Sequence, residues 1–470
     1  MQPTSATPPS QSLLASLLRR AAVIEPHEIA AVVAAFLLFF FMWGGYFAVR
    51  PVRETIGTVL GRQQVANLWI FTWLGSLLII PLYGAIVARF RRAAFLPATY
   101  GVVAIVLALI GIAMRGEAIN PLLAKFFYVF ISVVNLFLIS MFWSFLLELF
   151  DGRQTKRLFG VVAAGGSAGA LVGPLISDLT VSHVGNSGVL FIGASLFVAA
   201  IVCQRALLAI WTTRAGTVAG ATGKDDPLGG NMFAGITLIL RSPYILGIAL
   251  FVVFIATVNT LLYFEQLRLV EIYFPETTDR TRVFARLDWI VQSLTVLSQV
   301  LITGRVAQRF GVIALITAVP IAMIVGFLAL AVSFMVFPLP AEGAAATVVP
   351  ASFTVFVIFA VVFVLRRATE YAFVRPGREM LWSSLDKETK YKAKNTVDVP
   401  VYRFADVVSA QVNNGVSAAG AGATGVALLG AVVAAIWACV GWWLGRRHEA
   451  QTGSAQTQLE GTQQDEARAT

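Results

Sequence analysis

The sequence is poor in charged residues, cysteine and histidine, and each shortage excludes a class of protein. Charged residues make up 13% of the 470 residues, which is about half of their share in water-soluble domains. The two cysteines, Cys203 and Cys439, both lie in apolar runs, so we expect no disulfide framework. The three histidines lie far apart in the chain, so we expect no metal site. The chain also lacks a G-x-x-x-x-G-K-[ST] loop, so we expect no ATP-hydrolysing domain and no cofactor.

Apolar residues are what the chain has in excess, at 58% of the sequence. A water-soluble core cannot hide so much apolar surface, so the composition predicts a protein that crosses the lipid bilayer several times. The fold class that we expect is an all-α membrane protein with twelve transmembrane helices, because twelve apolar runs are long enough to span a membrane. These runs cover residues 29–49, 66–88, 94–114, 122–149, 158–181, 189–212, 244–264, 283–304, 312–337, 351–374, 398–420 and 422–445.

The longest polar gap between these runs divides them six to six. We therefore expect an N-terminal segment, a six-helix bundle, a linker, a second six-helix bundle and a disordered tail. Their expected bounds are 1–28, 29–212, 213–243, 244–445 and 446–470. The pattern G-x-x-x-x-R-F recurs at Gly84 and Gly304, after the second and the eighth run, which supports two parallel halves. Many secondary transporters are built from two such halves, with the substrate site between them.

The net charge of +10 indicates the orientation of the chain rather than binding to nucleic acid. With an even number of spans both termini lie on one side of the membrane, and most of the 35 lysines and arginines fall on that side. Cytoplasmic loops carry such an excess. We therefore expect a monomer in the inner membrane of a bacterium, with both termini in the cytoplasm. The first 28 residues lack a small-residue cleavage site after an apolar stretch, so we expect no removable signal peptide and expect the first apolar run to remain as a helix.

The stretch FGVVAAGGSAGALVGP, residues 159–174, contains the letters G-x-S-x-G of a serine-hydrolase elbow around Ser167. An elbow needs a strand before it, and residues 158–181 are typical of a membrane helix, so we reject a catalytic serine. The same stretch places small residues four apart, which allows two helices to pack closely. The residues that we expect to form this packing face, and to bend the helix, are Gly160, Gly165, Gly169, Gly173 and Pro174.

Polar side chains recur at helical spacing in several of the apolar runs. Charges and amides are costly in lipid and usually face a cavity or a neighbouring helix, and steps of three or four place them on one helix face. We expect these stripes to bind the substrate between the halves; the alternative is that they only hold neighbouring helices together. The candidates outside the tenth run are Arg50, Arg53, Lys125, Asn135, Asn259, Tyr263 and Gln292.

The tenth run ends in VFVLRRATEYAFVRPGRE, residues 362–379, with four arginines and two glutamates. Guanidinium groups bind phosphate and carboxylate oxygens through two parallel hydrogen bonds. We expect an anion site here; the alternative is a structural bridge from an arginine to an acid on another helix, such as Asp288 or Glu148. The substrate-binding candidates of this run are Arg366, Arg367, Tyr371 and Arg375. The expected coupling or gating charges of the whole chain are Glu54, Glu148, Asp288, Glu370 and Asp406.

Longer segments of the sequence resemble known transporter families. The loop at Gly84, Arg89 and Arg92 is similar to that of the major facilitator superfamily, although Ala88 replaces its usual acid. Four further segments resemble the ATP/ADP translocase family of nucleotide exchange transporters. They are FAVRPVRETIG (47–57), FWSFLLELFDGRQTKRLFG (142–160), ARLDW (285–289) and LRRATEYAFVRPGREMLW…KYKAKNTVD (365–398). This resemblance implies a nucleotide exchanger, rather than an enzyme, in which Arg50, Arg53 and Glu54 match the charged pattern that ends the first span.

The sequence therefore predicts a secondary transporter on a major-facilitator-like fold. Its expected substrate is a small phosphate-bearing anion, with ATP and ADP as candidates, and it would be exchanged by alternating access. One alternative is a proton-coupled exporter of an amphipathic compound, with Asp288 or Asp406 as the proton site. Another is a membrane scaffold or receptor that does not transport.

The predicted orientation can be checked with reporter fusions. A reporter joined after Arg447 should be active only when it is a type that works in the cytoplasm, because the positive charges of the chain gather on the side of the termini. The same reporter in the second predicted loop, between residues 88 and 94, is a matched cytoplasmic fusion. Activity of a periplasmic reporter after Arg447 would contradict the topology.

Overall fold

The computed structural model is built from helices, and the part of the chain that it describes contains no strand. The described residues are 24–89, 92–116, 120–215, 232–299, 301, 304–339, 352–385 and 387–469. This architecture agrees with the all-α class expected from the sequence. Most of the expected N-terminal segment and the middle of the expected linker lie outside the described residues.

The first helices of the chain follow the predicted apolar runs and extend several of them. They are α2 (Ile29–Leu60), α3 (Arg62–Arg89), α4 (Arg92–Ala113), α5 (Pro121–Leu149) and α6 (Gly152–Ala215). The long α6 consists of two helical segments that meet at Gly185, where φ is 67°. Glycine adopts this left-handed conformation without steric cost. The break falls between the predicted runs 158–181 and 189–212.

The second part of the chain contains shorter helical pieces between its long helices. These elements are α7 (Met232–Arg241), α8 (Pro243–Tyr273), α9 (Thr277–Ser298), α10 (Gly304–Val336), α11 (Thr354–Thr369), the π-helix η2 (Glu370–Val374), α12 (Arg375–Leu381), the 3₁₀-helix η3 (Trp382–Ser384), α13 (Lys387–Thr396), the π-helix η4 (Val397–Val401), α14 (Tyr402–Ala418) and α15 (Gly422–Ala469). The expected linker thus holds a helix, α7, whose apolar residues recur at helical spacing and which packs against α13.

Seven of the described helices are long and apolar enough to cross a membrane. These spans lie in α2, α4, α5, α6, α8, α10 and α15. The other predicted runs overlap α3, α9, α11 and α14. Two of these are short as α-helices, because α11 has 16 residues and α14 has 17, and a π-helix adjoins each of them.

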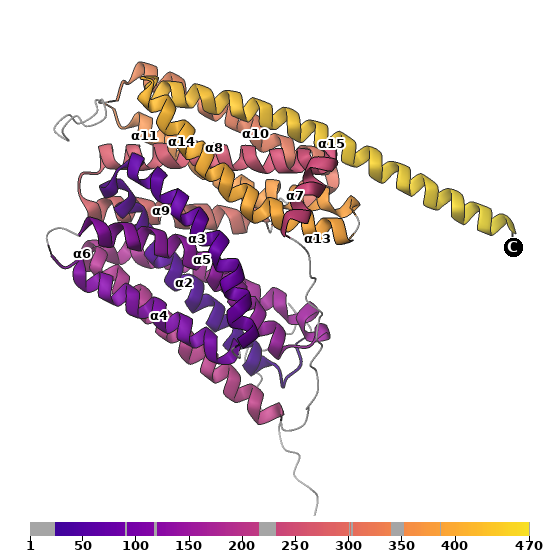
Figure 1. Ribbon diagram of the computed structural model, residues 1–470, viewed down its shortest axis with the longest axis horizontal. Helices are drawn as coiled ribbons and strands as arrows, with labels where there is room; N and C mark the ends of the chain where they lie inside the picture. The colour runs from indigo at the N-terminus through magenta and orange to yellow at the C-terminus, as the bar shows by residue number, and fades with distance from the viewer. Residues whose placement is uncertain are drawn as a thin grey trace, which may run out of the picture.

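The buried apolar residues form two clusters. One draws on α2, α4, α5 and α6, and the other mainly on α8 to α15. Figure 1 shows the same division, with α2 to α6 in one body and α8, α10, α14 and α15 in the other. Several helix pairs connect the bodies: α9 packs against both α6 and α2, and α14 packs against α3. This arrangement leaves faces of α2, α5, α8 and α11 directed toward the space between the bodies.

The glycine stripe of α6 packs directly against the backbone of α2. A Cβ atom built at Gly165, Gly169 or Gly173 would collide with the α2 main chain near Phe36, Phe40 and Gly44. The hydroxyl of Ser177, one turn further on, donates to the Ala48 carbonyl at 2.6 Å. Close backbone approach of this kind requires small residues. The stripe therefore fixes α2 and α6 as one tightly packed pair.

One expectation for this region differs from the structure. Gly160 was expected in the packing face, but a Cβ atom there would meet nothing within 4 Å, because the residue is exposed near the start of α6. Pro174 lies inside the helix, as expected. Ser167 lies in the middle of the helix, and its hydroxyl donates to the Ala163 carbonyl at 3.4 Å, which agrees with the rejection of a nucleophile.

The end of the chain also differs from the expected disordered tail. Helix α15 continues beyond Arg446 to Ala469 and extends away from the other helices (Figure 1). The residues after Arg446 include alanine, glutamate and glutamine, which favour a helix, and they contain no proline. The correction is therefore a continuation of the last predicted span as a polar helix.

The packing of α2 against α6 makes one substitution diagnostic. Gly169→Leu should destabilise the protein by about 1–3 kcal/mol or more, because the new side chain has to displace the backbone of α2. Thermal melting of the purified protein in detergent would measure this loss. Gly160→Leu is the matched control on the same helix, and equal melting temperatures of the two variants would contradict the proposed packing.

Candidate functional site

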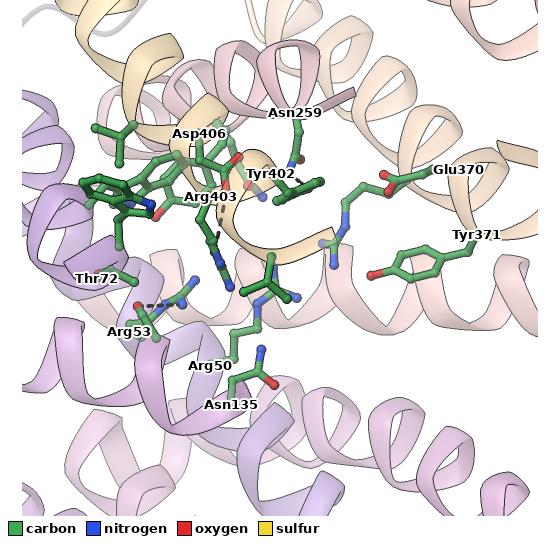
Figure 2. A pocket seen from close by; sticks show the side chains of 18 of the residues that line it. Arg50, Arg53, Thr72, Asn135, Asn259, Glu370, Tyr371, Tyr402, Arg403 and Asp406 are labelled. Carbon is green, nitrogen blue, oxygen red and sulfur yellow. Dashed lines mark hydrogen bonds and ion pairs between the residues drawn. The ribbon is translucent and has the colours of Figure 1, made fainter. Parts of the chain in front are cut away.

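A polar cavity lies between the two bodies, with a volume of about 470 Å³. It is lined by α2, α3 and α5 on one side and by α8, α11, η2, α12, η4 and α14 on the other. Figure 2 shows how charged and aromatic side chains from these elements converge. Among its lining residues are seven arginines, Arg50, Arg53, Arg366, Arg367, Arg375, Arg378 and Arg403.

The two arginines of α2 that line the cavity form ion pairs with nearby acids. Arg50 lies 3.5 Å from Glu54, one turn further on, and it donates to Asp288 of α9 at 3.4 Å. Arg53 forms an ion pair with Glu54 and donates to the Ser132 hydroxyl at 3.1 Å. Glu54 is almost fully buried, and these contacts give its carboxylate cationic partners.

A row of hydrogen bonds connects this charge cluster to the aromatic wall. The Trp69 indole donates to the Tyr128 hydroxyl at 3.0 Å, and the hydroxyls of Tyr128 and Tyr263 lie 2.6 Å apart. Tyr263 donates in turn to Glu54 at 2.7 Å. The guanidinium of Arg53 also stacks over the Tyr128 ring at 5.3 Å. Because the row joins α3, α5, α8 and α2, it fixes the side chains on both sides of the cavity.

The two neighbouring arginines of α11 have separate partners. Arg366 forms an ion pair with Glu370 and donates to the Asn259 side chain at 2.5 Å. Arg367 donates to Asp288 at 2.5 Å, so that Asp288 receives bonds from both α2 and α11. This is the structural bridge to another helix that the sequence left open as the alternative. Both arginines are buried, which makes such partners necessary.

The other arginines of this wall have weaker partners. The π-helix η2 follows α11 and presents Glu370 and Tyr371 to the cavity. Arg375 stacks over the Tyr371 ring at 4.1 Å, lies 3.7 Å from Glu370, and its side chain is 52% exposed. Because it is the most exposed of the seven arginines, Arg375 is available to a ligand that enters the cavity. π-Helical turns of this kind are frequent at functional sites.

Further along the chain, η4 and α14 complete the wall. Asp398 of η4 lies 3.3 Å from Arg378, and Asp406 of α14 lies 3.5 Å from Arg403 and accepts a bond from Thr260 at 3.4 Å. Pro400 lies inside η4, where it cannot donate a main-chain hydrogen bond. The irregular turn therefore adjoins the two charged pairs that face the cavity.

Most of the substrate-binding candidates line this one cavity. Those that do are Arg50, Arg53, Asn135, Asn259, Tyr263, Arg366, Arg367, Tyr371 and Arg375. Lys125 and Gln292 are half-buried on α5 and α9 and are not among its lining residues. Of the expected coupling charges, Glu370 and Asp406 line it, and Glu54 and Asp288 pair with its arginines. Glu148 is exposed near the end of α5 and is not among the lining residues.

The sequence analysis did not select several lining residues. Arg403 lies beside the polar stripe of the eleventh run rather than on it, and Arg378 follows the end of the tenth run. Trp69 and Trp73 of α3 carry no signal, because aromatic residues are common in apolar helices. A charged residue within an apolar run was the available signal for Arg403.

Polar contacts between α6 and α9 lie outside the cavity lining. Asp178 of α6 accepts two hydrogen bonds from Arg286, at 3.1 and 3.2 Å, and one from the Trp289 indole at 3.0 Å. The hydroxyls of Thr55 and Thr281 lie 2.6 Å apart. These contacts tie α9 to the α2–α6 pair, close to the Asp288–Arg50 contact.

One group of potential metal ligands occurs among the described residues, formed by Glu25, His27 and Glu28. Arg157 of α6 lies 3.3 Å from Glu25 and 2.6 Å from Glu28, and Gln154 also donates to Glu28. The carboxylates therefore already have cationic or amide partners, and the group fits a contact between the starts of α2 and α6.

Comparison with known proteins agrees with the resemblance seen in the sequence. The family model described as TLC ATP/ADP transporter matches residues 123–448. ADP,ATP carrier protein 1 of Chlamydia trachomatis serovar D is 28% identical over 297 residues, which cover 59% of this chain and 56% of that protein. ADP,ATP carrier protein 1 of Chlamydia muridarum is 27% identical over 297 residues, 59% of this chain and 55% of that protein. The chain thus spans little more than half the length of these relatives.

Solved structures support the fold. A bacterial homologue of the iron transporter ferroportin, in an inward-facing state, has a TM-score of 0.60 at 14% identity and covers 87% of this chain and 99% of its own. The nucleoside transporter NupG has a TM-score of 0.57 at 14% identity and covers 91% of this chain and 99% of its own. At such low identity the likeness concerns the fold alone.

The bridge at Asp288 should be essential for stability. Asp288→Asn removes the charged partner of the buried Arg367, and breaking a buried ion pair costs about 3–5 kcal/mol. Thermal melting should therefore show a much larger loss than for Asp398→Asn, whose side chain is 26% exposed and pairs with Arg378. Equal losses in the two variants would contradict the bridge. The double variant Asp288→Asn/Arg367→Gln should recover part of the stability, because it leaves no unpaired guanidinium at position 367.

Proposed function

The chain belongs to the TLC ATP/ADP transporter family, and we propose that it exchanges nucleotides, or a related phosphate-bearing organic anion, across the membrane by alternating access. The observation that carries this proposal is the cavity with its seven arginines inside a membrane-spanning helical protein. Its volume of about 470 Å³ lies in the range of sites for small organic ligands.

The chemistry of the cavity supports an anionic substrate. Guanidinium groups remain charged in proteins and bind phosphate oxygens through two parallel hydrogen bonds. The aromatic side chains of Trp69, Tyr128 and Tyr371 lie beside the arginines and offer flat apolar surface to an organic group. The curated relatives are named ADP,ATP carriers. A nucleotide has both a phosphate chain for the arginines and an organic group for the aromatic side chains.

The same features disfavour the proton-coupled exporter. Asp288, one of the two acids considered as a proton site, already accepts hydrogen bonds from Arg50 and Arg367. An amphipathic cation would also meet a strongly positive wall. Exchange of an anion is therefore the better account of the site.

The architecture that we propose has twelve transmembrane helices in two six-helix halves. In this reading α6 supplies two spans, one on each side of Gly185, and α10 supplies one span after a second glycine break at Gly311. The helices α3, α9, α11 and α14 supply the spans with polar faces. The protein would lie in the bacterial inner membrane as a monomer, with both termini in the cytoplasm. The contacts of Asp178 with Arg286 and Trp289 would then lie toward the periplasm and close that side of the cavity.

Counterflow in proteoliposomes tests the function. Uptake of labelled ADP or ATP should require unlabelled nucleotide inside the vesicles, since an exchanger returns only with substrate bound. Arg375→Gln should raise the apparent KM about tenfold, the effect of losing one charged hydrogen-bonding partner. Arg205→Gln, an exposed arginine near the end of α6, is the matched control. Absence of exchange with every nucleotide and phosphate ester, in folded protein, would refute the proposal.

A further inference from the structure

Two arginines from opposite bodies point toward one another across the cavity. Arg50 lies on α2 and Arg403 on α14, and Figure 2 shows their guanidinium groups directed into the space between these helices. The side chains are 21% and 28% exposed, so both reach the open part of the cavity. They differ in this respect from Arg366 and Arg367, which are almost buried.

The partners of these two arginines are distant. Arg50 lies 3.5 Å from Glu54 and 3.4 Å from Asp288, and Arg403 lies 3.5 Å from Asp406. Charged hydrogen bonds between guanidinium and carboxylate groups are normally about 2.7–2.9 Å long. Both guanidiniums are therefore only loosely paired, and each keeps hydrogen-bonding capacity for another anion.

The charge balance of the cavity also leaves room for an anion. Seven arginines line it, and five carboxylates pair with them: Glu54, Asp288, Glu370, Asp398 and Asp406. Seven positive and five negative charges leave a surplus of two positive charges among these described residues. Like charges that face each other in a partly buried site repel strongly. A ligand with two negative charges would remove both the surplus and the repulsion.

We propose that Arg50 and Arg403 form a phosphate clamp, in which a single dianionic phosphate group bridges the two guanidiniums and draws α2 and α14 together. This inference rests on the proposed function and narrows it, because it makes a doubly charged phosphate the recognised group. Arg366 and Arg367 differ from this pair, since they are more deeply buried and hold shorter contacts, Arg366 with Asn259 and Glu370 and Arg367 with Asp288. The rest of the substrate would lie along the remaining arginines and the aromatic wall.

The clamp predicts selectivity for a dianion over a monoanion. AMP and cyclic AMP carry the same base and sugar, but the phosphate of AMP is a dianion and that of cyclic AMP is a monoanion. Titration calorimetry on the protein in lipid nanodiscs should show that AMP binds about tenfold more tightly or better, as expected for one additional charged contact. Equal affinities in the wild-type protein would overturn the clamp.

Variants locate the selectivity. Arg403→Gln should weaken AMP binding about tenfold and cyclic AMP binding less than about threefold, because only the dianion bridges both groups. Combining it with Arg50→Gln should add little, since either change breaks the same bridge. Arg205→Gln is the control for loss of charge outside the cavity. Retention of full selectivity in folded Arg403→Gln, or fully additive effects of the two changes, would overturn the clamp.

Two further measurements complete the test. If Arg403→Gln does not fold, Arg403→Lys replaces it; its point charge should lower AMP affinity about threefold or more, and an unchanged affinity would overturn the clamp.

Inorganic phosphate separates this inference from the proposed function. Binding of phosphate that depends on Arg403, without binding of any nucleotide, would support the clamp and refute nucleotide exchange. Nucleotide exchange with unchanged affinity in Arg403→Gln would support the proposed function and overturn the clamp.

Discussion

A charge that is buried in a membrane protein must have a partner, and Asp288 is the carboxylate on which most of this site depends. It receives hydrogen bonds from Arg367 of α11 and Arg50 of α2, and therefore joins three helices. A buried guanidinium without a partner costs several kcal/mol, so α2, α9 and α11 cannot separate without a replacement for this contact. Helix α9 thus holds, through Asp288, lining arginines that come from both bodies.

Sharing of carboxylates between arginines explains how the cavity can carry a net positive charge in a stably folded protein. Three carboxylates are shared, since Glu54 lies beside Arg50 and Arg53, Asp288 beside Arg50 and Arg367, and Glu370 beside Arg366 and Arg375. Sharing gives every arginine a partner while the arginines outnumber the acids. The buried members of each set have the short contacts, and the exposed ones have the long contacts. In the folded protein the buried arginines are therefore tightly paired, and the more exposed arginines keep hydrogen-bonding capacity for a ligand.

Much of this could be predicted from residue spacing, and the remainder could not, for identifiable reasons. A spacing of four residues revealed the glycine stripe and the Arg366–Glu370 pair, because both depend on helical geometry within one segment. The packing of the stripe against α2 and the bridge from Arg367 to Asp288 both involve residues that are far apart in the sequence. Spacing could not predict the first, and the sequence named the bridge only as one alternative. Lys125 and Gln292 lie on the predicted stripes but outside the cavity lining, because a stripe also serves helix packing. Arg403 was missed because it lies beside the polar stripe of its run rather than on it, although Asp398, Tyr402 and Asp406 of that stripe line the cavity as well.

The close packing of α2 against α6 determines how a substrate would act on the rest of the molecule. Because their backbones touch along the glycine stripe, α2 and α6 should move together, and with them Arg50 and Asp178. Both residues also bond α9, Arg50 through Asp288 and Asp178 through Arg286. In an empty cavity, withdrawal of α9 would leave Arg50 with Glu54 as its one remaining partner. A phosphate held by the proposed clamp would replace Asp288 on Arg50 and thereby lower the cost of separating α9 from α2. The contacts at the base of the cavity would then open readily only with substrate bound, which is the property that distinguishes an exchanger from a carrier that returns empty.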